Sequence, residues 1–152
     1  LLYAVTQKTA PELIISRSNP ADPHFGLLIL KCTQVRKQDI LVAKNYLTED
    51  EVDTLNRLVV IFLETAELRA KRQTITSMGF WRENVGQIIV SNGFPLLSGA
   101  GTVSHARMEQ KLEPLYLDFD QRRKAEEARA ADAQDEAELK ALENTIKNRP
   151  KK

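Results

Sequence analysis

The stretch that decides the fold is residues 48–72, TEDEVDTLNRLVVIFLETAELRAKR. Thr48 and Glu51 have the spacing of a capping box, in which the two side chains satisfy free backbone N–H groups at a helix start. Acidic residues fill the first turn and basic residues the last, as the helix dipole favours. Apolar residues recur between these ends at steps of three and four: Val52, Leu55, Val59, Phe62 and Ala66, with Leu58, Ile61 and Leu63 widening the stripe. This pattern predicts a long helix that is central to the core and buried on more than one side.

A second capping-box pattern, Thr9 to Glu12 with Pro11 in the first turn, predicts a helix that ends near Ser18. The following loop, residues 19–24, holds two prolines, which fix φ and remove backbone donors. The N-terminal residues 1–7, LLYAVTQ, resemble the last turns of a helix that begins upstream, so we expect the chain to be a fragment of a longer protein.

Three further segments carry apolar patterns. Residues 25–30, FGLLIL, suit a buried strand or a short buried helix, and periodicity does not separate the two. Residues 39–47 predict a short helix. Another helix is predicted from Thr76 or Ser77 to Asn92, where Asn92-Gly93 is a typical helix end. Its inward-facing residues would be Trp81, Val85, Ile88 and Ile89.

The C-terminal half predicts a helix from about Thr102, with an apolar stripe of Met108, Leu112, Leu115 and Phe119. After Asp120 the composition shifts to Ala and charged residues of high helix propensity, which predicts an extended or paired helix. The predicted architecture is therefore mostly α: a helical bundle with a long buried central helix. We expect residues 1–120 to form the core domain and residues 121–152 an extended charged helix.

The composition bounds the function. Lys plus Arg (22) nearly equals Asp plus Glu (21), so the overall charge gives no support for nucleic-acid binding, which usually goes with a basic excess on the binding face. The longest strongly apolar run, residues 58–63, is far shorter than the roughly 20 residues that span a bilayer. Cys32 is the only cysteine, which excludes an intrachain disulfide and favours a reducing, cytoplasmic compartment.

The candidates for chemistry are few. His24 and His105 lack metal-ligand spacing, and Cys32 is expected to be a small buried residue, so we predict no metal and no cofactor. The glycine-rich loop before the last helix could bind an anion on its N–H groups and hydroxyls, or could simply lead into a cap at Thr102 or Ser104. The anion-binding candidates are Gly99, Gly101, Thr102 and Ser104.

The tail carries charges in blocks. Arg122, Arg123, Lys124 and Arg129 precede Asp132, Asp135, Glu136 and Glu138. These blocks fit a solvated helix face with mixed charges, or an antiparallel pair of two such helices in a homodimer. The candidate partner interface is Leu139, Leu142 and Ile146.

Four short stretches resemble the C-terminal region of the RhuM family of virulence-associated bacterial proteins. They are TAPELI (9–14), AKNYL (43–47), LNR (55–57) and GTVSH (101–105), which together span most of the chain. The resemblance implies a bacterial cytoplasmic protein whose upstream part is a DNA-binding domain of phage type. It implies no catalytic residues.

Two classes of function follow. The first is a non-enzymatic interaction or oligomerisation domain, with DNA contacted only by the upstream domain. The second is a toxin-like enzyme acting on nucleic acid or nucleotide through a polar cluster. That cluster would be Asn45, Tyr46, Asn56, Arg57, Ser104 and His105, although an Asn-Arg pair on an apolar helix is also typical of a buried structural network.

Overall fold

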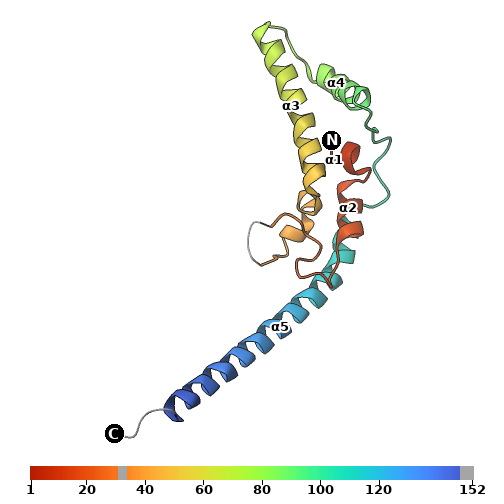
Figure 1. The fold of residues 1–152 in the computed structure, drawn as a ribbon. Helices are drawn as coiled ribbons and strands as arrows, with labels where there is room; N and C mark the ends of the chain where they lie inside the picture. The colour runs from red at the N-terminus through yellow and green to blue at the C-terminus, as the bar shows by residue number, and fades with distance from the viewer. Residues whose placement is uncertain (31–33, 148–152) are drawn as a thin grey trace.

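The computed structural model describes residues 1–30 and 34–147, with side chains to residue 144; Cys32 lies outside them. Within these ranges the chain is helical and has no strand, which confirms the mostly α prediction (Figure 1). The elements are α1 (Leu2–Thr6), α2 (Ala10–Arg17), the 3-10 helices η1 (Asp39–Leu41) and η2 (Ala43–Tyr46), α3 (Glu49–Lys71), α4 (Met78–Ser91) and α5 (His105–Lys147).

Two predicted segments differ in form. The helix predicted over residues 39–47 is split into η1 and η2, because Val42 between them is extended (φ −101°, ψ 106°). Residues 25–30 form neither strand nor helix, but Phe25 and Leu27 are buried, so the segment is the apolar part of the core that its composition indicated. Leu28 beside them is exposed.

The larger core lies where α2, residues 25–30, residues 35–46 and the first half of α5 meet. Phe25 packs edge-on against Phe119, with ring centroids 5.4 Å apart, and against Tyr116 at 6.2 Å. The predicted stripe of α5 faces this core as expected. Its buried residues are Ile14, Phe25, Leu27, Val35, Ile40, Tyr46, Met108, Leu112 and Phe119.

A second, smaller core joins α1, α3 and α4. Its buried residues are Ala4, Leu58 and Ile89, and Val5, Val85 and Phe94 pack around them. Ser77 caps α4 by accepting from the N–H of Phe80, and Gly93 (φ 79°) follows its end, as the sequence predicted. This smaller core holds α4 against α3 through few side chains.

Helix α3 has the predicted bounds and capping box but is not a buried central helix. Leu58 is its one buried residue, whereas Leu63 is 63% exposed and Val60 is 53% exposed. The prediction of burial on more than one side is therefore wrong. The physical reason is that α1 and α4 lie on one side of α3, so they cover one face of it and leave the others open (Figure 1).

Helix α5 is 43 residues long, or about 65 Å at 1.5 Å per residue. Only its first part packs on the body, and the side chains of residues 124–144 are all exposed. We call residues 121–144 the arm. Helix α3 rises from the body toward the top of the view, whereas α5 runs obliquely down and to the left (Figure 1). None of the described helices is long and apolar enough to cross a membrane.

Candidate interaction surfaces

Two members of the predicted polar cluster, Asn45 and Tyr46, serve the body. Tyr46 is fully buried and its hydroxyl donates to the Ile40 carbonyl at 2.9 Å. Burial raises the pKa of Tyr46 to about 12. The Asn45 amide donates to the carbonyl of Asp39, and the Asn45 carbonyl accepts from the N–H of Leu28. These groups satisfy backbone atoms of Leu28, Asp39 and Ile40.

The other members lie apart from them. Asn56 and Arg57 are exposed on α3, so neither belongs to a buried network, and Arg57 pairs with Asp53 at 2.7 Å. His105 lies 3.4 Å from Glu109 on the surface of α5. Ser104 accepts from the N–H of Arg107 and so caps α5. Asn45 and Tyr46 thus lie in the body, Asn56 and Arg57 on the exposed side of α3, and Ser104 and His105 at the start of α5.

The loop proposed to bind an anion contacts a carboxylate of the chain itself. The N–H and the hydroxyl of Thr102 both donate to Glu12 Oε1 at 2.6 Å. The other oxygen of Glu12 accepts from the N–H of Thr9 at 2.8 Å and caps α2. These hydrogen bonds lower the pKa of Glu12 to about 2. A free anion would therefore have to displace Glu12 from Thr102.

Gly101 lets this loop approach α2. Its φ is 81°, and a Cβ at this position would lie 2.5 Å from the Thr9 methyl carbon. Gly101 therefore serves the close contact between the loop and the start of α2. Gly99 has open space around it.

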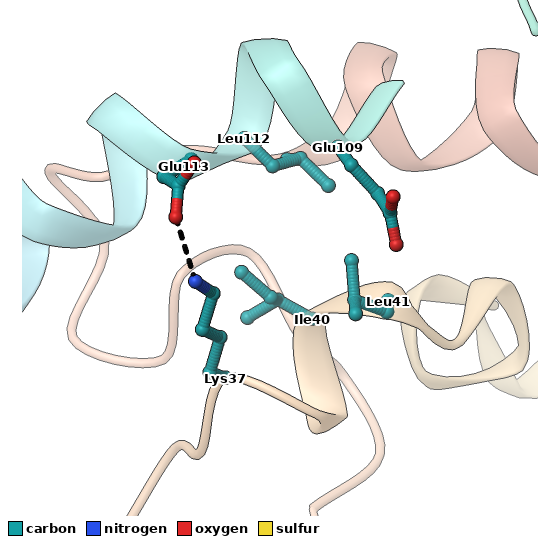
Figure 2. Close-up of a pocket in the computed structure, with 6 residues that line it drawn as sticks. All are labelled: Lys37, Ile40, Leu41, Glu109, Leu112 and Glu113. Atoms are coloured by element: carbon teal, nitrogen blue, oxygen red, sulfur yellow. Dashed lines mark hydrogen bonds and ion pairs between the residues drawn. The ribbon is translucent and has the colours of Figure 1, made fainter. Parts of the chain in front are cut away.

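The hollow in Figure 2 lies between η1 and α5 and measures about 220 Å³. Lys37 and Glu113 point toward each other at one side of it and pair at 2.8 Å, while Ile40 and Leu41 face Leu112 of α5 across it. The ion pair raises the pKa of Lys37 and lowers the pKa of Glu113. Ligand sites typically measure about 300–1,000 Å³, so this hollow is small for a substrate. The pair joins η1 to α5 across it.

A broader hollow of about 680 Å³ lies beside α3, but it is open. It contains Asn56 and Arg57 of the predicted cluster; the other four members lie elsewhere. Its remaining lining residues are Asp53, Thr54, Leu58, Val60, Ile61, Asn92 and Phe94. Among the described residues no three His, Cys, Asp or Glu side chains are placed to hold a metal ion.

The most unusual surface is the open face of α3. Five residues follow each other there at steps of four, three, four and three, and we call them the α3 seam: Val52, Asn56, Val59, Leu63 and Ala66. Leu63 is 63% exposed, and Val52 and Ala66 are half-buried. Contiguous apolar side chains on a surface typically mark a contact with another protein. The sequence predicted that Val52, Val59, Leu63 and Ala66 would lie inside the core, and it placed Asn56 in the polar cluster.

The arm presents a second surface. Leu139 and Leu142 are 62% and 61% exposed, and the side chain of Ile146 lies outside those that the structure describes. Near its start the basic residues already have partners: Arg122 pairs with Asp118, and Arg123 and Lys124 pair with Asp120. Such pairs within one turn support an exposed helix.

Comparison with known proteins finds a family match over most of this chain. No curated protein and no solved structure matches it. The model of one family, described as the virulence protein RhuM family, matches residues 1–127, which include the whole helical body and the first residues of the arm. The chain, with its helical body, its exposed α3 seam and its long α5, belongs to the RhuM family.

Proposed function

We propose that this chain is a non-enzymatic protein-interaction module that joins two copies of itself. The observation that carries the proposal is the surface of α3. This helix of 23 residues buries only Leu58, while Val60, Leu63 and Leu68 are each more than half exposed. Burying a Leu or Val side chain contributes about 1.5–3 kcal/mol, so covering several of them would drive association.

The polar groups support the same proposal. Tyr46, Asn45 and Ser104 satisfy backbone groups of the body, and Glu12 holds Thr102. They serve architecture, and the enzyme alternative loses its candidate cluster. A two-fold dimer joined to the upstream DNA-binding domain that the resemblance implies would present two such domains to two half-sites.

The test is the mass of the chain in solution, measured by sedimentation equilibrium over a range of concentrations. We expect a species of twice 17.2 kDa. Leu63→Glu should shift the chain toward the monomer, because it places a charge in the apolar seam. The matched control is Leu96→Glu, which changes an exposed leucine in the loop after α4. A strictly monomeric wild-type chain at high concentration would overturn the proposal.

A further inference from the structure

The connection between α3 and α4 exposes apolar side chains at one end of the molecule. We call residues 68–82 the tip; they comprise the last turn of α3, the connection and the start of α4 (Figure 1). Ile75 is 94% exposed and Met78 is 82% exposed, the highest values among the large apolar side chains that the structure describes. The tip therefore holds in water two groups that gain free energy wherever an apolar phase covers them.

The backbone that carries these side chains is tied to α3. Arg69 Nε donates to the hydroxyl of Thr76 at 3.1 Å, and Arg69 Nη2 donates to the carbonyl of Ile75 at 3.3 Å. The same guanidinium lies over the ring of Phe80, 3.7 Å from its centroid, a contact that stabilises both groups. Since the connection is already fixed in this way, little of it has to be ordered when the tip binds a surface.

The tip is also basic, because it contains four cations and no Asp or Glu. The cations are Arg69, Lys71, Arg72 and Arg82. Lys71 pairs with Glu67 in the preceding turn of α3. Arg72 and Arg82 are exposed and form no ion pair among the residues that the structure describes. These two guanidinium groups are therefore open to an anion from outside the chain.

A cation and an apolar side chain share one face of α4. Met78 and Arg82 are four positions apart, so they are neighbours on the helix surface. Glu83 is the next residue, but each step along a helix turns the side chain by about 100°, which directs Glu83 to another face. On the α3 side, Arg72 precedes Ile75 in the same short connection. Cations thus flank both exposed apolar groups.

We infer that the tip binds the surface of a bilayer that contains anionic phospholipids. Ile75 and Met78 enter the interfacial layer, and Arg72 and Arg82 contact lipid phosphates. A nucleic acid would pair with the cations but would leave both apolar side chains in water. A bilayer accepts protruding apolar groups without a preformed pocket. The tip lies beyond the α3 seam, which ends at Ala66, so the inference does not rest on the proposed dimer.

Co-sedimentation of the full chain with lipid vesicles tests the apolar part of this contact. We expect binding to vesicles of phosphatidylglycerol and phosphatidylcholine, and little binding to phosphatidylcholine alone. Ile75→Ser should weaken the binding by about tenfold or more, because an isoleucine is lost from the buried surface. The matched control is Leu28→Ser, which changes a leucine that is 61% exposed in a loop elsewhere. Equal losses in the two variants would overturn the inference.

A pair of double variants tests the cations. Arg72→Gln combined with Arg82→Gln should weaken binding to the anionic vesicles by about tenfold or more, since each cation near such a surface contributes about a fivefold gain. Arg107→Gln combined with Lys111→Gln removes the same net charge from exposed residues of α5 and should have a smaller effect. Equal effects would show that only the net charge of the chain acts, and would overturn the inference.

Insertion is measured with one indole placed at the tip. Trp81 is the only tryptophan of the chain, so Trp81→Phe combined with Ile75→Trp moves the fluorophore to position 75. We expect its emission to shift to shorter wavelength on the anionic vesicles and to be quenched by lipids brominated in the acyl chain. The inference is overturned if the chain stays in the supernatant, if the indole is not quenched, or if Ile75→Ser and the arginine variants weaken binding to a DNA duplex or a protein but not to vesicles. Circular dichroism shows that each variant keeps its helices.

Discussion

The guanidinium of Arg17 and the carboxylate of Glu51 form a bidentate ion pair that joins α2 to the first turn of α3. Nη1 and Nη2 each donate to one oxygen of Glu51 at 2.6 Å, and Nη1 also donates to the carbonyl of Tyr46. Glu51 accepts from the N–H of Thr48 as well, within the capping box of α3. The same carboxylate therefore caps α3 and fixes the direction in which it leaves the body.

Glu51→Gln should lower the free energy of unfolding by about 1.5–3 kcal/mol, the range for hydrogen bonds to charged groups. Glutamine retains the capping box and removes the charge that Arg17 binds. The matched control is Glu49→Gln in the same turn, where the side chain is exposed. Urea unfolding at pH 7 measures both, and equal stabilities of the two variants would contradict the role of the pair.

The same pair predicts a dependence of stability on pH. Arg17 lowers the pKa of Glu51 from 4.5 to about 2. The stabilisation is therefore complete above about pH 4.5 and is lost as the pH falls toward 2. In Glu51→Gln this part of the loss of stability at acid pH should be absent. The stabilities of the variant and the wild type should therefore converge at low pH. Urea midpoints measured between pH 2 and 6 check it.

Thr102→Val should raise the pKa of Glu12 from about 2 toward its ordinary value, because the Thr102 hydroxyl bond is the largest cause of the lowered pKa. The N–H of residue 102 remains, so part of the effect should persist. An NMR titration of the Glu12 carboxyl carbon measures the change. Thr65→Val is the control, since the Thr65 hydroxyl bonds only the Ile61 carbonyl of its own helix. An unchanged pKa in Thr102→Val would show that the hydroxyl bond is absent.

Local signals in the sequence predicted the local structure well. The capping boxes at Thr9 and Thr48 mark the starts of α2 and α3, because a cap depends on residues only three positions apart. The stripe from Met108 to Phe119 faces the core as predicted. The partners of Glu12 and Glu51 were not predicted, since Thr102 is 90 positions from Glu12 in the sequence and only the fold brings them together.

The burial of α3 shows where apolar spacing stops being informative. The steps between Val52 and Ala66 are those of a helix that packs against something, and the sequence alone does not say whether the neighbour belongs to the same chain. The sequence predicts from this stripe a core within the chain, but Val59, Ile61 and Leu63 are exposed. A spacing of four and three is equally typical of a coiled coil between chains. For the predicted polar cluster, the sequence shows which residue types are present, but it does not show that the fold holds them apart.

Gly26→Ala should destabilise the body by about 1–3 kcal/mol, the usual range for a residue held in a strained backbone conformation. Gly26 has a φ of 80°, and a Cβ there would collide with the Arg17 carbonyl oxygen. Gly93→Ala is the matched control, because Gly93 has nearly the same φ of 79° with open space around it. Thermal unfolding of both variants separates backbone strain from collision, and Gly26→Ala should have the lower midpoint. Equal midpoints would show that the collision is relieved at no measurable loss.

Tyr46→Phe should lower the free energy of unfolding by about 0.5–1.5 kcal/mol, because phenylalanine cannot donate the hydrogen bond that the buried hydroxyl makes to the Ile40 carbonyl. The ring remains, so the packing of the larger core is kept. Tyr3→Phe removes the same group from a half-buried residue of α1 and serves as the control. Because the Tyr46 carbonyl accepts from Arg17, a loosened η2 should also weaken the contact with Glu51. Urea unfolding of Tyr46→Phe, Glu51→Gln and the double variant tests this coupling. We expect the free energy of unfolding to fall less in the double variant than the sum of the two single changes. Strict additivity would place the hydroxyl outside the network that holds α3.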